Sequence, residues 1–275
     1  TAVTNKALTA DDLDTVTAFE NVVIANNLAF SLTTDDLMNA TIAMDVDATA
    51  MTDTLFTFSG ADEDDGTFNI TVGGTADHSI TLGQLGDTLT STSTGAITVV
   101  GTAGANTVTL GTGADLITLG SGNDTVTSGT GADTIKFATA NLTTDDTING
   151  GDGTDVIQTT AAMDLADADF TNVTNVETIS LAAASKNMTL IMGAQTSEAG
   201  ISTVTTGTGI NAITVGVGHT AALTISQTAT GTDTFTATAY TGALTVGLNS
   251  QGQGADTITG GTGTNDTLSI TAVAN

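Results

Sequence analysis

The chain has 275 residues, of which 30 are Asp or Glu and three are Lys, and its formal net charge is −27. This charge repels the phosphate backbone, so we exclude nucleic acid as a partner, and no apolar run is long enough for a transmembrane segment. There is no Cys, Pro or Trp, and Glu, Lys and Arg are scarce among the helix formers, which predicts β structure almost throughout.

Residues 1–65 are the least repetitive part of the chain. An apolar run, Val22 to Ile24, follows an acidic segment and is typical of a strand. We expect an irregular, β-rich N-terminal segment here, and a β-sandwich-like arrangement is the alternative. A second acidic run at 62–65 precedes Gly66, and it is predicted either to hold a cation or to form a solvated loop.

From residue 70 onward, apolar strand centres recur, mostly at intervals of nine or ten. A sandwich would normally carry Pro in its turns and more aromatic residues in its core, whereas a chain that repeats one short turn and one short strand has to coil. We therefore predict an all-β fold, a parallel β-roll or β-solenoid over 66–160 and again over 204–275. The strand centres are Ile70, Ile80, Leu89, Ile97, Val108, Ile117, Val126, Ile135, Ile148, Ile157, Val204, Ile213, Leu223, Phe235, Leu244, Ile258 and Leu268.

Residues 102–137 repeat one phrase four times: TAGANTVTL, GTGADLITL, GSGNDTVTS and GTGADTIKF. Two phrases make one coil, so residues eighteen apart should stack, Asn106 over Asp124 and Asp115 over Asp133. Carboxylates about 5 Å apart repel by about 3 kcal/mol at an effective dielectric near 20, and three lysines in the whole chain cannot neutralise them. Oxygen donors on glycine turns, without Cys or paired His, favour Ca²⁺.

These phrases resemble the nonapeptide repeat of RTX proteins, G-G-x-G-x-D-U-x-x, whose turns bind Ca²⁺ between coils. The best single match runs from Gly150 to Ile157, and a last pair occupies 252–258 and 260–268. The copies depart from the pattern where Asn106 replaces Asp and where the last turn has one extra residue. The resemblance implies Ca²⁺ as the cofactor and the following ligands, the glycines through their carbonyl groups: Asn106, Gly111, Gly113, Asp115, Gly120, Gly122, Asp124, Gly129, Gly131, Asp133, Asp146, Asp152, Asp155, Asp256, Asn265 and Asp266.

The segment 161–203 interrupts the repeats and contains the phrase ADADFTNVTNVETISLAAA. A calcium-binding turn followed by this phrase resembles bacterial surface-layer proteins and large RTX adhesins that are exported by type I secretion. We expect this segment to be a linking β region. The acidic charge also predicts folding where Ca²⁺ is abundant, so the expected location is extracellular, at a bacterial cell surface.

No catalytic constellation is visible in the sequence. It has no H-E-x-x-H and no G-x-S-x-G, and the two histidines, His78 and His219, are far apart and are expected at the surface or in turns. We predict that the chain is not an enzyme.

Three functions fit these observations. The first is a secreted, calcium-dependent structural protein that assembles with copies of itself into a surface layer or filament, with a cell-surface glycan as a further partner. The second is an adhesin or an ice-binding module, because Thr-x-Thr rows resemble those of RTX antifreeze repeats. The third is the C-terminal export domain of a larger RTX enzyme.

Overall fold

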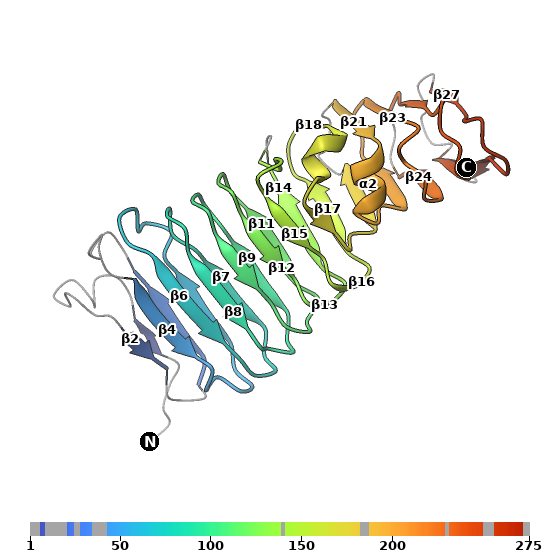
Figure 1. Cartoon of the computed structure of the whole chain (residues 1–275). Coiled ribbons are helices and arrows are strands. Elements are labelled where there is room, and N and C mark those ends of the chain that lie inside the picture. The colour runs from blue at the N-terminus through green and yellow to red at the C-terminus, as the bar shows by residue number, and fades with distance from the viewer. Residues whose placement is uncertain are drawn as a thin grey trace. The chain divides into compact units, whose positions relative to one another are not determined.

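The computed structural model describes residues 6–8, 21–24, 28–34, 43–138, 141–181, 187–228, 231–249 and 256–271. The fold is an all-β parallel β-solenoid, as predicted (Figure 1). Contacts divide the chain into two units, Thr1–Ile135 with Thr147–Gly153 and Lys136–Asp146 with Thr154–Asn275. Within each unit, successive strands alternate between two faces, which we call the first face and the second face.

Unit 1 carries most of the regular coils. The strands of its first face are β1 (Lys6–Leu8), β3 (Phe30–Thr33), β5 (Phe56–Ser59), β7 (His78–Thr81), β9 (Ile97–Val100) and β11 (Leu116–Leu119). The strands of its second face are β2 (Asn21–Val23), β4 (Met44–Ala48), β6 (Phe68–Val72), β8 (Thr88–Ser91), β10 (Thr107–Thr109), β12 (Thr125–Thr127) and β15 (Thr147–Asn149). Two short strands, β13 (Thr130–Gly131) and β16 (Asp152–Gly153), pair within the turns, and β14 (Thr134–Phe137) contains the division between the units.

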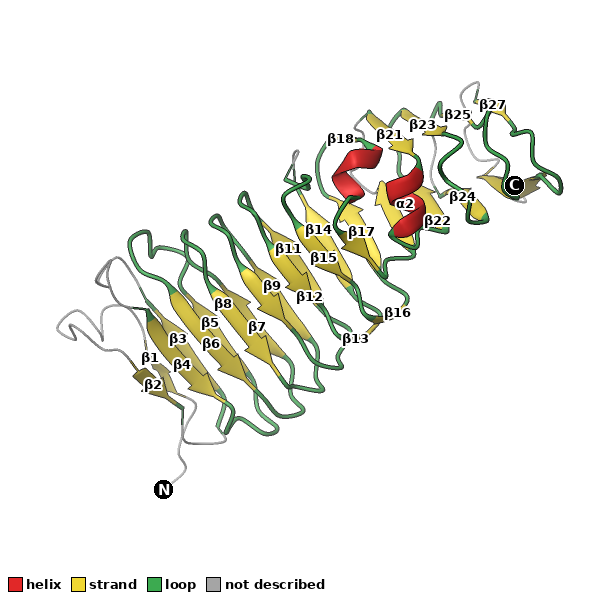
Figure 2. Cartoon of the chain, in the orientation of Figure 1, coloured by secondary structure: helices red, strands yellow, loops and turns green. Residues whose placement is uncertain are grey.

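Unit 2 has longer turns and the helical elements (Figure 2). Its first face is β17 (Val156–Thr159), β20 (Thr178–Leu181), β22 (Thr203–Thr206), β24 (Leu223–Gln227), β26 (Leu244–Asn249) and β28 (Thr267–Thr271). Its second face is β18 (Asp164–Leu165), β21 (Met188–Met192), β23 (Asn211–Val215), β25 (Thr234–Thr236) and β27 (Thr257–Thr259). The unit also contains β19 (Val173–Thr174), a 3₁₀ helix η1 (Asp167–Phe170) and a helix α2 (Ala194–Glu198). Within the described part of the chain, no helix has both the length and the apolar character needed to cross a bilayer.

The register between coils follows the repeat length. In the central block, Val108 pairs with Val126 and Val99 pairs with Ile117, and each pair is eighteen positions apart. Coils outside this block are longer, since Val46 pairs with Ile70, twenty-four positions on. Two nonapeptides therefore make one coil only where the sequence repeats at nine.

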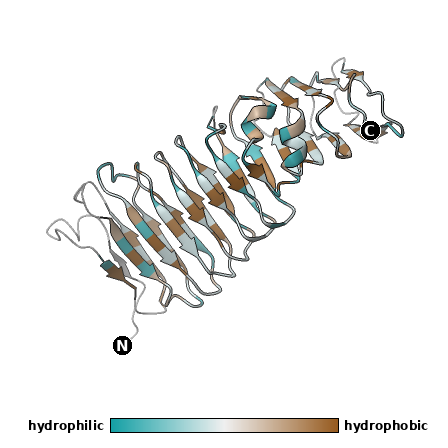
Figure 3. Cartoon of the chain, viewed as in Figure 1, coloured by the Kyte–Doolittle hydropathy of each residue, from teal (hydrophilic) through white to brown (hydrophobic). Residues whose placement is uncertain are grey.

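The core is a narrow layer between the two faces. Strand residues alternate between buried apolar and outward polar positions, visible as alternating colours along the strands of unit 1 (Figure 3). The centres Ile70, Leu89, Val108 and Val126 stack in one column, each with at most 1% of its surface exposed. Threonine holds many of the outward positions, because a β-branched residue suits the extended backbone and its hydroxyl remains in water.

The two less repetitive segments also belong to the solenoid. In the N-terminal segment, Phe30 pairs in parallel with Phe56, so the sandwich-like alternative is not found among the residues described there. In the linking segment, Ile179 pairs with Ile157 on one side and with Val204 on the other. Helices η1 and α2 are therefore insertions between strands that keep the parallel pairing. The four predicted segment boundaries stay a prediction.

The two histidines were expected at the surface or in turns, and neither lies at the surface, although His219 follows the turn at Val217–Gly218. His78 and His219 are 2% and 0% exposed. The amide of Phe56 donates to Nδ1 of His78 at 3.1 Å, and Nε2 of this ring bonds to the carbonyl of Gly73 at 2.9 Å, so a neutral imidazole satisfies both groups. Burial lowers the pKa of His219, whose ring packs against Tyr240. Turns of a solenoid are covered by the next coil, which encloses side chains that a sequence pattern assigns to loops.

Candidate metal centre

Turns that lead into the first face of unit 1 carry Asp115 and Asp133, one coil apart. The amide of Ile97 donates to Oδ1 of Asp115 at 2.7 Å, and the amide of Asp115 donates to Oδ1 of Asp133 at 2.7 Å. Each carboxylate thus bonds to the backbone of the preceding coil. The stacking of Asp115 with Asp133, expected from the spacing of eighteen, is present, and we call this side of the coils the first edge.

Turns that lead into the second face form the second edge, with Asn106 and Asp124. The amide of Asp87 donates to Oδ1 of Asn106 at 3.1 Å, and the amide of Asn106 donates to Oδ1 of Asp124 at 2.9 Å. The two predicted pairs therefore lie on opposite edges, as expected. Asp146 lies just before β15, is 1% exposed, and accepts from the amide of Thr143 at 2.8 Å within its own turn.

The glycines of these turns are required by the approach of neighbouring coils. Gly131 has a φ of 150°, and a Cβ there would lie 2.0 Å from the carbonyl oxygen of Gly113 in the preceding coil. The carbonyl of Gly111 accepts from the amide of Thr130 at 2.9 Å, and that of Gly129 accepts from Asp152 at 3.0 Å. Carbonyl groups predicted as ligands therefore point along the stack, between one coil and the next. The remaining two, those of Gly120 and Gly122, belong to the turn before Asp124.

The carboxylates of the first edge are buried. Asp115 and Asp133 are 2% and 0% exposed, and Oδ2 of Asp115 accepts no hydrogen bond. Burial, and then the charge of Asp133, raises the pKa of Asp115 to about 6, and burial also raises the pKa of Asp133. Lys136, the lysine nearest in sequence, lies on the outward side of β14. A cation would remove a repulsion of about 3 kcal/mol between charges one coil apart.

The donor set of the first edge fits Ca²⁺. It combines carboxylate oxygens with carbonyl oxygens of glycine turns, the hard ligands that this ion takes in flexible geometry. In the described ranges, no three acidic or histidine side chains come together. A cation at this edge would therefore take much of its coordination from the backbone.

Asn106 fills the second edge differently. Its Nδ2 donates to the carbonyl oxygens of Ala103 and Gly104 at 3.1 and 3.2 Å and to Oδ1 of Asp124 at 3.1 Å. These three acceptors are of the kind that would otherwise face a cation, and the Oδ1 of Asn106 is held by Asp87. The amide group of Asn106 therefore donates to oxygens that a metal beside Asp124 would use, and its role as a calcium ligand stays a prediction.

Replacing Asn106 by Asp is expected to create a calcium requirement at this edge. The Asn106→Asp chain should lose about 1–3 kcal/mol of stability without Ca²⁺, because a buried carboxylate replaces three donated hydrogen bonds. It should also bind one more Ca²⁺ than the parent in isothermal titration calorimetry. Asn123→Asp, at an exposed position of the next turn along the same edge, is the control and should change neither quantity. An unchanged ion count in Asn106→Asp would contradict this view of the second edge.

The full motif at 150–157 splits into a buried and an exposed part. Asp155 is 0% exposed, and its amide donates to Oε2 of Glu177 at 2.8 Å. Asp152 is exposed and belongs to β16, where it pairs with Thr130. Glu177 was not predicted as a site residue, because it lies within the phrase of the linking segment, where no glycine turn precedes it.

The C-terminal pair has the same hydrogen-bond pattern as the central edges. The amide of Asp233 donates to Oδ1 of Asp256 at 2.8 Å, and the amide of Leu244 donates to Oδ1 of Asp266 at 3.1 Å. Asn265 is exposed and left-handed, with a φ of 74°. Residues 250–255, which include the glycines before Asp256, lie outside the described residues.

A further corner of this type, which was not predicted from the sequence, lies at Asp233. This carboxylate is 0% exposed and accepts from the amide and Nδ2 of Asn211 at 2.8 and 2.9 Å, from Oγ1 of Thr206 and from Nε2 of Gln227, both at 3.1 Å. Four donors satisfy it without a cation. The sequence feature that could have predicted this corner is the G-x-D at 231–233. It matches the G-x-D at 131–133, but it does not belong to a nine-residue repeat.

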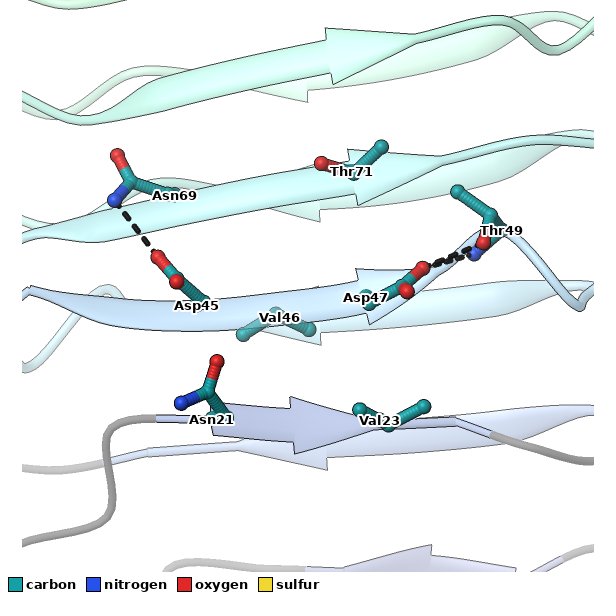
Figure 4. A pocket seen from close by; sticks show the side chains of 8 residues that line it. All are labelled: Asn21, Val23, Asp45, Val46, Asp47, Thr49, Asn69 and Thr71. Atoms are coloured by element: carbon teal, nitrogen blue, oxygen red, sulfur yellow. Dashed lines mark hydrogen bonds between the residues drawn. The ribbon is translucent and has the colours of Figure 1, made fainter.

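A shallow depression of about 410 Å³ lies on the outward side of β2, β4 and β6 (Figure 4). Asp45 accepts from Nδ2 of Asn69 at 2.8 Å, and Asp47 accepts from the amide and Oγ1 of Thr49 at 2.9 and 2.6 Å. The Thr49 hydrogen bonds lower the pKa of Asp47. A carboxylate with a lowered pKa is poorly suited to act as a general acid at neutral pH.

Comparison with protein families identifies the repeats. A family model described as RTX calcium-binding nonapeptide repeat (4 copies) matches residues 100–135, 143–161 and 252–268. The first range contains both edges of the central block, the second contains Asp146, Asp152 and Asp155, and the third contains Asp256, Asn265 and Asp266. The match does not extend to the phrase at 166–184. A search of curated proteins and a search of solved structures each gave no match.

Proposed function

Because the chain is an RTX-repeat protein whose β-roll carries calcium-binding motifs, we propose that it is a secreted structural protein that assembles into an extracellular array when Ca²⁺ is present. Repeats of this kind are typical of secreted bacterial proteins. Extracellular calcium modules work at about 10⁻⁴ to 10⁻³ M Ca²⁺. An ion bound at that concentration would neutralise a buried carboxylate such as that of Asp115, whose Oδ2 accepts no hydrogen bond. In this proposal Ca²⁺ sets the stacking of the coils, and the stacked coils provide the surfaces for assembly.

The observation that carries the assembly proposal is the exposure of apolar residues on β28. Among the described strands β28 pairs with β26, and Leu268 pairs with Val246, which is only 2% exposed. Leu268 and Ile270 therefore occupy core-facing positions, yet they are 55% and 63% exposed. A strand with exposed apolar residues favours contact with a further strand that buries them. A second copy of the chain offers strands of the same parallel pattern, and such head-to-tail contacts build open filaments or sheets.

Electron microscopy of the protein in millimolar Ca²⁺ and in EGTA tests this proposal. We expect sheets or filaments with Ca²⁺ and separate particles in EGTA. Ile270→Lys should abolish the assemblies by placing a charge on β28, whereas Val217→Lys, at a residue that is 66% exposed in a turn of the same unit, should leave them intact. Separate particles in both buffers would contradict self-assembly.

A structural function without catalysis is part of the same proposal. The acidic side chains of the first edge, Asp115 and Asp133, stand one coil apart, which suits an ion bridge between coils. A cell-surface glycan is proposed as the attachment partner. Retention of the chain on cells stripped of protein but not of surface polysaccharide would support this attachment.

Ice binding is the second candidate, and the threonine array on the second face favours it. Thr88, Thr107, Thr125 and Thr147 form one column across four strands, in register. A parallel column at 71, 90, 109 and 127 lies two residues further along each strand. Thermal hysteresis measured with Ca²⁺ tests this function, and freezing without hysteresis would remove it.

A further inference from the structure

A buried acidic turn lies outside the matched repeats, between β5 and β6 at residues 60–66. Of the four acidic residues in the run 62–65, only Glu63 is buried, and it is 0% exposed. The amide of Gly66 donates to Oε1 of Glu63 at 2.9 Å, which holds the carboxylate across its own turn. The other oxygen, Oε2, is buried and accepts no hydrogen bond. An unpartnered carboxylate oxygen in a closed turn calls for a positive charge beside it.

A second carboxylate meets the first within the turn. The carboxyl group of Asp65 lies within hydrogen-bonding reach of Glu63. Burial chiefly, and then this contact with Asp65, raises the pKa of Glu63 to about 7. Two carboxylates in contact are held together either by a shared proton or by a cation.

The turn of the next coil adds oxygen atoms on the same edge. A Cβ placed on Gly83 would lie 3.2 Å from the carbonyl oxygen of Glu63, 3.3 Å from that of Gly60 and 3.3 Å from Oδ2 of Asp87. Three oxygens from two coils thus converge beside a residue without a side chain. Asp87 is 1% exposed, and its two oxygens accept from the amides of Phe68 and Gly83 at 2.8 and 2.7 Å.

We propose that the turn at 60–66 binds a divalent cation between itself and the turn at 83–87, with the carboxylate of Glu63 as the principal ligand. The carboxylate of Asp65 and the carbonyl groups of Gly60 and Glu63 supply further oxygens. This hard, oxygen-only set on a glycine-containing turn selects Ca²⁺. The site shares its ion with the proposed function, but it needs neither the nonapeptide repeats nor assembly. It would be a cation site on the second edge in which Glu replaces the Asp of the repeats.

The test counts Ca²⁺ ions on the full chain and on two matched variants. Glu63→Gln keeps the shape of the side chain and removes its charge, and Asp64→Asn removes one charge from an exposed position of the same turn. We expect native mass spectrometry and calorimetry with Ca²⁺ alone to show one ion fewer for Glu63→Gln and an unchanged number for Asp64→Asn. Far-ultraviolet circular dichroism in Ca²⁺ checks that both variants keep the parent fold.

Each outcome separates this inference from the proposed function. If Glu63→Gln binds as many ions as the parent, Glu63 is a protonated buried acid and the site is refuted, whatever the assembly state. If Glu63→Gln loses one ion while the parent forms no arrays, the site stands and the assembly proposal falls. If the parent binds no Ca²⁺ at all, both are overturned.

Discussion

Removal of Ca²⁺ by EGTA is expected to lower the midpoint of thermal unfolding by roughly 10 °C or more. Each ion stabilises the fold by about 2.7 kcal/mol when it is present at a hundred times its Kd, and several sites are predicted along the edges. Without the ion, Asp115 and Asp133 keep their buried charges and repel each other. Circular dichroism melts in Ca²⁺, in EGTA and in EGTA with excess Mg²⁺ provide the measurement.

Hydrogen exchange adds a control within the same molecule. The amides of Ile97 and Asp115 donate to the first-edge carboxylates, so they should lose protection in EGTA. The amide of Asn211 donates to Asp233, a carboxylate already satisfied by four donors, and should lose less. Equal protection of all three amides in Ca²⁺ and in EGTA, together with an unchanged melt, would mean that calcium does not hold the coils together.

Gly131→Ala is expected to destabilise the protein by roughly 2–4 kcal/mol, the largest effect of a single methyl group that we predict. The new Cβ would lie 2.0 Å from the carbonyl oxygen of Gly113, and the φ of 150° is unfavourable for alanine, so the backbone of two coils has to move. That movement would also shift a predicted calcium ligand. Urea unfolding and the calcium titration should therefore both report the change.

Gly247→Ala is the matched control for this substitution. A Cβ at Gly247, in β26, would have no neighbour closer than 3.9 Å, so the change should be neutral or slightly stabilising. A Gly131→Ala protein with the stability of the parent would show that adjacent turns do not approach as closely as described.

The sequence predicts the central coils well because local and long-range signals agree there. A period of nine fixes turn, strand and coil length together, so the pairing of Val108 with Val126 and the stacking of Asp115 with Asp133 follow from arithmetic. The apolar strand centre of each phrase then has to face inward, since at least one of its two neighbours is a threonine. In the central coils, the apolar pattern of each strand and its pairing with the next coil therefore specify the same structure.

Outside the central block, coil length varies, and prediction from the sequence loses register. The coil from Phe30 to Phe56 has twenty-six residues, so no short period marks the N-terminal segment as part of the solenoid. For the same reason Asp233 was not predicted as a site residue, because its turn contains the G-x-D of the repeats but is not nine residues from another copy. Burial of Glu63 was also not predictable, because a run of four acids looks the same whether or not one of them turns inward.

The identity of the donor at each carboxylate depends on contacts between coils that no local pattern encodes. Asn106 illustrates this point, because a family pattern places a ligand at its position, whereas its Nδ2 donates to three oxygens. Only the contacts between stacked coils can distinguish a side chain that binds the ion from an amide group whose N–H groups occupy the same oxygens. This difference decides how many ions the chain can take.

Strand pairing links each coil only to the coils directly before and after it. In such a one-dimensional arrangement, a single formed coil serves as the template for the next, and growth can proceed outward in both directions. The eighteen-residue coils, with the shortest loops to close, should wind first when the chain meets calcium. An unfolded polypeptide arriving outside a cell would then form its solenoid coils one after another, starting from its middle, at a rate set by the ion concentration around it.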